Sequence, residues 1–187
     1  RAHALTGGYV DWLRANVEEW LATVDIPQCV EDRCIDLAEL SADLRARPNE
    51  DSKKVEKHET KELPTRLARQ NIRLAAHLVV VLNKRSVDSE VLRIVRKVAL
   101  DTAHGHSLDI VKWLCSANPK VDGHSYQECG GLPDKTIAAW LGMTAERATK
   151  YLTFLRKISV LNYGATHAGL GSLTERVHRL YLRIMEG

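Results

Sequence analysis

Three arginines in the segment "ELPTRLARQNIRLAAH", which begins at Glu62, have the residue type and spacing that can bind phosphate. Arg66, Arg69 and Arg73 are three and four residues apart, so a helix would carry them on one broad side. A guanidinium stays charged and presents a planar fork of N–H donors, which matches phosphate oxygens. The same pattern is typical of an ordinary solvated face, in which Arg66 and Arg73 cover core side chains with their stems or pair with Glu62 or Asp43.

No complete active site accompanies these arginines. The sequence has no G-x-x-x-x-G-K-[ST] or G-x-G-x-x-G loop for a nucleotide, and no H-E-x-x-H or C-x-x-C metal set. No Ser, His and Asp or Cys and His arrangement stands out. His104 and His106 flank Gly105 at a predicted helix end, where a cation suits the helix dipole and a metal site is the less favoured alternative. We expect no metal, cofactor or catalysis in this chain by itself.

The composition favours helices, and the charge is unevenly distributed. Of the 187 residues, 44% are hydrophobic and 27% are charged, but only 5% are aromatic, which disfavours a β-sandwich. Residues 1–62 contain 9 Lys and Arg against 14 Asp and Glu, whereas residues 63–187 contain 18 against 10. A polyanion is therefore expected to meet the C-terminal part of the chain.

The cysteines and the apolar segments indicate a cytoplasmic protein without a membrane span. The four cysteines lack metal-ligand spacing and are expected to be reduced thiols (Cys29, Cys34, Cys115 and Cys129). The longest apolar run, Leu74–Leu82, is interrupted by His77 and is too short to cross a bilayer. No signal peptide is recognisable. Because the chain begins at Arg1 and not at Met, we expect a piece of a longer protein.

Hydrophobic periodicity predicts four helices in the first half of the chain, at Tyr9–Thr23, Val30–Arg45, Pro64–Asn83 and Val87–His104. Thr6 or Gly8 is the expected cap of the first helix, and Pro64 suits the first turn of the third. A charged loop or linker, Pro48–Lys61, separates the second helix from the third. The residues expected to face the core are Val10, Leu13, Val17, Trp20, Leu21, Val30, Cys34, Leu37, Leu40, Leu44, Leu67, Ile72, Leu74, Ala75, Leu78, Val79, Leu82, Val87, Val91, Ile94, Val95, Val98 and Leu100. We interpret residues 1–105 as a helical bundle.

The second half of the chain, residues 106–187, is predicted to form shorter units. Helices are expected at 107–117, 132–143 and 144–157, followed by a strand at Ile158–Tyr163, a glycine-rich loop at Gly164–Gly171 and a last amphipathic helix or strand that buries Leu173, Val177, Leu180 and Ile184. This order is typical of a winged helix-turn-helix. The predicted fold class is therefore mainly α: a helical bundle followed by a winged helix-turn-helix with a small β-wing.

The winged helix-turn-helix supplies candidate DNA-binding residues. Its first helix is expected to bury Ile137, Ala138 and Leu141, Gly142 makes the turn, and its second helix buries Ala145, Ala148, Leu152 and Leu155. This leaves Thr144, Glu146, Arg147, Lys150 and Tyr151 exposed on the helix that would enter the major groove, with Lys157 at its end and His167 at the tip of the wing. Arg147 suits guanine or phosphate, and Lys150 suits phosphate. Glu146 would repel phosphates, so a protein-docking or packing module is the alternative.

The segment "LPTRLARQNIRLAAHLVVVLNKRSVDSEVLRIVRKVAL" resembles the helical lid of AAA+ replicative helicases of the minichromosome-maintenance type. That lid carries a T-R, L, R-L-A, A-H pattern, and the matching residues here are Thr65, Arg66, Leu67, Arg73, Leu74, Ala75 and His77. The order of the preceding helices, the charged loop and a following winged helix is similar too. Phage and plasmid primase–helicases have related lid-like helices, and the two relatives are not distinguished.

The resemblance implies a role for one arginine. The arginine of the T-R element is a sensor-2 residue in that family, and it reaches the γ-phosphate of ATP at a subunit interface, so Arg66 would act in trans; Arg69 is a second candidate. ATP and magnesium would be bound by the parent protein, an ATP-dependent hexameric DNA helicase, because the nucleotide-binding core is missing from this chain. The implied partners are DNA, bound with little sequence specificity, the rest of the ATPase core and neighbouring subunits.

Two other functions fit the same sequence. One is a stand-alone winged-helix regulator of transcription or plasmid replication, which predicts an apolar dimer seam on the first four helices and tight binding to one palindromic site. The other is a protein-docking adaptor, which predicts no DNA binding even at low salt. The helicase interpretation predicts weak, salt-sensitive binding to many sequences.

Overall fold

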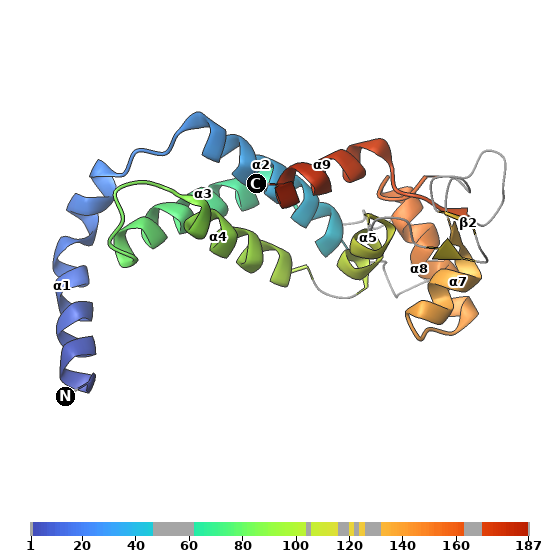
Figure 1. Cartoon of the computed structure of the whole chain (residues 1–187), viewed down its shortest axis with the longest axis horizontal. Coiled ribbons are helices and arrows are strands. Elements are labelled where there is room, and N and C mark those ends of the chain that lie inside the picture. The colour runs from blue at the N-terminus through green and yellow to red at the C-terminus, as the bar shows by residue number, and fades with distance from the viewer. Residues whose placement is uncertain are drawn as a thin grey trace, which may run out of the picture.

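The computed structural model describes residues 2–46, 62–103, 106–115, 120–121, 124–125, 132–162 and 170–186 (Figure 1). The helices are α1 (Ala2–Thr23), α2 (Gln28–Arg45), α3 (Pro64–Val81), α4 (Ser89–Asp101), α5 (Ser107–Cys115), α7 (Asp134–Trp140), α8 (Ala145–Lys157) and α9 (Glu175–Glu186). The strands are β1 (Lys120–Val121), β2 (His124–Ser125), β3 (Leu132–Pro133) and β4 (Leu170–Gly171). The prediction of a mainly α-helical fold is confirmed. The loop predicted at Pro48–Lys61 lies outside the described residues.

Helix α1 starts well before its predicted beginning at Tyr9 and continues through Gly7 and Gly8. The predicted cap at Thr6 or Gly8 is therefore wrong. Each glycine weakens a helix by only about 1 kcal/mol relative to alanine, which the good helix formers Ala2, Ala4 and Leu5 help to offset. Helix α1 packs on α3 and extends away from the other helices (Figure 1). None of the helices in the described part of the chain is long and apolar enough to cross a membrane.

Helix α2 lies at the centre of the core because both of its sides are covered. Its predicted apolar stripe is confirmed, since Val30, Cys34, Leu37, Leu40 and Leu44 are all buried. On its other side, Ala38 and Ala42 pack against Leu67 and Ala68 of α3. The buried Asn71 of α3 also donates a hydrogen bond to the Cys34 carbonyl, at 3.3 Å. The small alanine side chains let the two helix backbones approach closely. Among the described elements, α2 and α3 therefore pack together most extensively.

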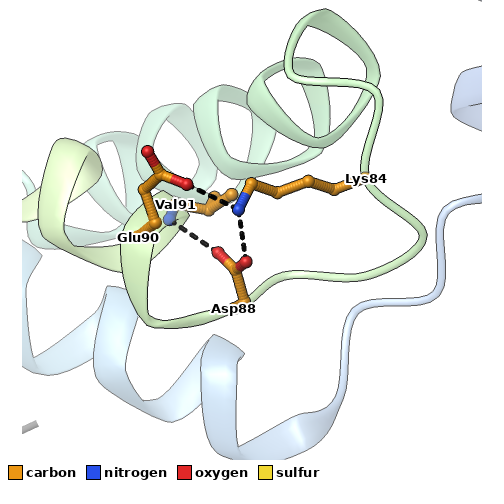
Figure 2. A network of polar contacts seen from close by, with 4 residues as sticks. All are labelled: Lys84, Asp88, Glu90 and Val91. Carbon is orange, nitrogen blue, oxygen red and sulfur yellow. Dashed lines mark hydrogen bonds and ion pairs between the residues drawn. The ribbon is translucent and has the colours of Figure 1, made fainter.

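A short turn connects α3 to α4, and Lys84 in this turn pairs with two acidic residues at the start of α4 (Figure 2). Pro64 occupies the first turn of α3 as predicted, and Asn83 adopts a positive φ of 52° after the helix ends. The Lys84 ammonium lies between the carboxylates of Asp88 and Glu90, and hydrogen bonds to these two groups raise the pKa of Lys84. Asp88 in turn caps α4 by accepting a 3.0 Å hydrogen bond from the Val91 amide.

Two predicted core residues of this hairpin are wrong. Leu82 is 37% exposed because α3 ends before it, and Val98 of α4 is 45% exposed. The last turn of α4 buries Leu100, as predicted, and buries Ala99 in place of Val98. The apolar spacing of α4 is compatible with either choice, because periodicity alone does not show which residues the neighbouring helices reach.

The second half of the chain forms a tight pair of helices beside short paired segments. Helices α7 and α8 pack on each other, and β3 pairs antiparallel with β4. The strand predicted at Ile158–Tyr163 is reduced to a single bridge between Leu161 and Leu173. Its apolar residues still reach the core, since Val160 and Leu161 are buried.

The last predicted element is a helix, α9, and it returns to the first half of the chain. Its predicted inward residues, Leu173, Val177, Leu180 and Ile184, are all buried. The helix packs on α2 and α5, and ion pairs join Arg176 to Asp43 and Arg183 to Asp36 of α2. One hydrophobic cluster contains residues of both halves, so the division at residue 105 into two domains stays a prediction.

Candidate nucleic-acid interface

Helices α7 and α8 meet at a turn that requires glycine. Gly142 has a φ of +64°, a conformation that other residues adopt only with strain, and Thr144 caps α8 by accepting a hydrogen bond from the Arg147 amide at 3.4 Å. Ile137 and Ala138 of α7 are buried as predicted, together with Ala148, Leu152 and Leu155 of α8; Leu141 is half-buried. The predicted turn and cap are therefore both confirmed, and they fix the direction in which α8 leaves α7.

A bidentate ion pair holds the far ends of the same two helices together. The Arg156 guanidinium in the last turn of α8 donates to both carboxylate oxygens of Asp134 at the start of α7, at 3.1 and 2.6 Å. Only 11% of the arginine side chain and 21% of the aspartate side chain are exposed. Each charge also suits its helix end, an acid at the N-terminus and a cation at the C-terminus. Sequence reasoning missed this pair because its partners are 22 residues apart.

The predicted DNA-facing side of α8 is exposed, but part of its charge is compensated. Arg147, Lys150 and Lys157 are exposed, as is the capping residue Thr144. The Lys150 ammonium lies 2.8 Å from a Glu146 carboxylate oxygen, and this contact raises the pKa of Lys150 and lowers that of Glu146. Arg147 and Lys157 have no acidic partner within the described residues. Arg147 and Lys157 are therefore the cations of α8 that a polyanion can bind without displacing a carboxylate.

Two residues of α8 lie differently from their predicted positions. Ala145 is exposed, although it was predicted to be buried. Tyr151, predicted to be exposed, is half-buried. Its hydroxyl shares a hydrogen bond with Ser107 of α5, and its ring meets the edge of His106 at a centroid distance of 6.4 Å. Tyr151 thus connects α8 to α5, which makes it a poor DNA contact.

Short paired segments lie next to α8, where the wing was predicted. The side-chain amide of Asn162 donates to the Leu173 carbonyl at 2.8 Å, and the Thr174 amide donates to the Val160 carbonyl at 3.0 Å. These bonds place residues before the predicted wing next to residues after it, and β4, at the end of the predicted wing, pairs with β3. His167, the residue predicted at the tip, lies outside the described residues.

The arginines of the opening segment lie on the exposed side of α3. Arg66, Arg69 and Arg73 are all exposed, which matches either of the two interpretations offered above. The Arg66 guanidinium pairs with Glu62, a carboxylate that Arg45 also approaches at 3.2 Å. Asp43, the other predicted partner, is fully buried and pairs with Arg176 of α9 instead. Arg66 lies on α3 and the cations of the predicted DNA-facing side lie on α8, and the two helices lie apart in the fold (Figure 1), so the two groups form separate surfaces.

The His, Cys, Asp and Glu side chains of the described residues do not gather into a metal site, since no group of three or more of them is arranged to bind a metal ion. Burial raises the pKa of Cys34 and of Cys115 to about 11, so these two thiols are poor nucleophiles. A comparison of the chain with protein-family models, with curated protein sequences and with solved structures found no match.

Proposed function

We propose that this chain is the helical lid and winged-helix region of a hexameric, DNA-unwinding ATPase, in which α8 contacts DNA. The observation that carries the DNA-binding part is the arrangement of α7, Gly142 and α8, which leaves Arg147, Lys150 and Lys157 exposed on one helix. The order of α5, β3, α7, α8, the Leu161 bridge and β4 supports a winged helix-turn-helix.

The lid part of the proposal rests on the sequence resemblance and on the position of Arg66. This residue lies in the first turn of α3, and 65% of its side chain is exposed. Its present partner, Glu62, is a carboxylate that a phosphate group could replace, because guanidinium binds both anions through the same fork. In the assembled protein, Arg66 would reach the ATP of a neighbouring subunit and stabilise the charge that develops during phosphoryl transfer. ATP and magnesium would be held by the ATPase core.

DNA binding is tested with fluorescein-labelled random duplex, forked and single-stranded DNA at two salt concentrations. We expect micromolar binding to all three, weakened by salt. Replacing Arg147 by Ala removes one phosphate contact and should reduce the log–log salt slope for duplex DNA by about 0.9. Lys135→Ala, an exposed cation on α7, is the matched control and should leave the slope unchanged. Absence of binding at low salt would favour the adaptor function, and nanomolar preference for one sequence would overturn the helicase proposal.

The lid role is tested separately in the intact protein. An Arg66→Ala variant should retain nucleotide binding by the core and lose most of its ATPase activity, because a sensor arginine acts on the transition state. Arg45→Ala is a suitable control, since it removes the other cation beside Glu62 and leaves Arg66 in place. Unchanged ATPase activity in Arg66→Ala would show that this arginine belongs only to a solvated helix face.

One observation favours the stand-alone regulator as a second candidate. Helix α1 exposes the large apolar side chains of Tyr9 and Trp12 by 40% each, and Val10, which was predicted to face the core, by 38%. The Tyr9 and Trp12 rings stack at a centroid distance of 6.0 Å. An apolar surface on the first helices is what a dimeric regulator requires. Sedimentation equilibrium distinguishes the candidates, because the regulator should be a dimer that Trp12→Ala dissociates.

A further inference from the structure

The exposed side of α3 carries an uninterrupted polar and basic row. Arg69, Gln70, Arg73 and His77, which we call the α3 stripe, are all exposed and are spaced to lie along one side of the helix. Helix α3 contains no aspartate or glutamate between Pro64 and Val81. At 1.5 Å per residue, the stripe is about 12 Å long.

Several exposed cations on other helices are paired within their own helix, whereas the arginines of the stripe are not. Lys97 pairs with Asp101, Lys150 with Glu146, and Arg179 with Glu175, each across one helical turn. Such pairs are the usual way in which a solvated helix balances its charge. Within the described residues, Arg69 and Arg73 have no acidic partner. The stripe is therefore a local concentration of positive charge that no acidic residue in the described part of the chain neutralises.

The chemistry of the stripe selects one class of ligand. We propose that the α3 stripe binds the phosphate backbone of a nucleic acid, as a second contact surface in addition to α8. A duplex presents one negative charge per about 1.7 Å of its axis, so a stripe of this length faces several phosphates at once. Arg69 and Arg73 provide forked donors, and the Gln70 amide provides a neutral one.

The composition of the stripe argues against a protein or a membrane as its ligand. Protein interfaces centre on a buried aromatic or aliphatic anchor with a polar rim, and membrane-surface helices have an apolar face toward the lipid. Each fully exposed residue from Arg69 to His77 is polar or charged. A surface of this kind, with cations and no apolar anchor, suits a ligand whose outer surface is a row of phosphates.

The test uses the whole chain and removes two charges from the stripe. In anisotropy titrations with a labelled 30-base-pair random duplex, Arg69→Ala/Arg73→Ala should reduce the log–log salt slope by about 1.8, at about 0.9 per lost contact. Between 50 and 200 mM salt, the affinity of the unchanged protein should then fall about twelvefold more than that of the variant. Arg69→Lys/Arg73→Lys keeps the charge and should retain the slope.

The matched control is Arg93→Ala/Lys97→Ala, which removes two exposed cations with the same spacing from α4. The salt slope of this control should equal that of the unchanged protein. If the control lowers the slope as much as the α3 variant does, loss of any two exposed cations weakens DNA binding, and the stripe proposal is overturned. An unchanged slope in the α3 variant also overturns the stripe proposal. All of these variants replace exposed side chains, so circular dichroism should show unchanged helix content.

Two further arms identify the source of the phosphate and separate this proposal from the one made for α8. If the α3 double variant loses binding of a fluorescent magnesium nucleotide while its salt slope for the duplex stays unchanged, the stripe binds nucleotide phosphate, which overturns a backbone site. If Arg147→Ala leaves the slope unchanged while the α3 variant lowers it, the α8 proposal fails and the stripe is supported. If Arg147→Ala lowers the slope while the α3 variant leaves it unchanged, the stripe proposal fails and the α8 proposal is supported.

Discussion

The Arg156–Asp134 pair provides a prediction whose size follows from its geometry. The Arg156→Met variant keeps the apolar stem of the side chain and removes the guanidinium, so the carboxylate of Asp134 loses two charge-assisted hydrogen bonds. Removing one partner of a fully buried pair destabilises a protein by about 3–5 kcal/mol, because the remaining charge is left uncompensated. Since 21% of the Asp134 side chain is exposed, water partly replaces the guanidinium, and we expect about 2–3 kcal/mol.

The predicted loss should be visible in two measurements. For a chain of this size, about 2.5 kcal/mol lowers the melting temperature by roughly 5–10 °C, which circular dichroism resolves easily. Because the pair fixes α8 against α7, affinity for duplex DNA should fall as well. The double variant Arg156→Met/Asp134→Asn completes a double-mutant cycle, and its coupling energy should exceed about 1 kcal/mol because the two side chains interact directly.

An exposed ion pair on the same helix serves as the control. Lys150→Ala removes a partner of Glu146, but both side chains are more than three-quarters exposed, so no measurable change in melting temperature is expected. Arg156→Met and Lys150→Ala therefore remove one ion-paired cation each from α8 in different surroundings. Equal melting temperatures for the two variants would refute the reasoning, as would a coupling energy near zero.

Two other predictions concern the core and the turn. Iodoacetamide at pH 8 should label the exposed Cys29 and spare Cys34, whose pKa burial and the charge of Glu31 raise to about 11. Because the unfolded thiol ionises near 9.0 and the folded one near 11, the free energy of unfolding should fall between about pH 9 and 11, by at most roughly 2.7 kcal/mol from this group, and a Cys34→Ala variant should lack this component. Gly142→Ala should lower the free energy of unfolding by about 1–2 kcal/mol through its positive φ alone, since nothing lies within 4 Å of the added methyl; a change below about 0.3 kcal/mol in urea titrations would contradict this.

Local signals in the sequence predicted most of the secondary structure. The apolar stripe of α2, the proline at the start of α3, the glycine turn at Gly142 and the cap at Thr144 each depend on a few neighbouring residues, and all are confirmed. The predicted start of α1 was wrong because the alanines and the leucine before Gly7 and Gly8 allow the helix to begin ahead of these two glycines. Such boundaries depend on small differences in propensity, which packing can reverse.

The predictions that failed concern side chains whose surroundings come from distant parts of the chain. Tyr151 is half-buried because α5 brings Ser107 and His106 next to it, and nothing in the sequence of α8 shows this. Asp43 would have been a plausible partner for an arginine of α3, but α9 supplies Arg176 from 133 residues away. One signal was present: Asp43 lies three residues after Leu40 and directly before Leu44, next to the predicted apolar stripe of α2, which indicates a charge with a dedicated partner.

The return of α9 to α2 has a consequence for the synthesis of the protein. Asp36 and Asp43 pair with arginines that the ribosome adds 147 and 133 residues later, so the part of α2 that α9 covers stays exposed while most of the chain is synthesised. Contacts so distant in sequence form late and slowly, and exposed apolar surface promotes aggregation in the meantime. Ribosome-bound chains that end before α9 should therefore be cut by protease within α2, and chains extended through α9 should be resistant there.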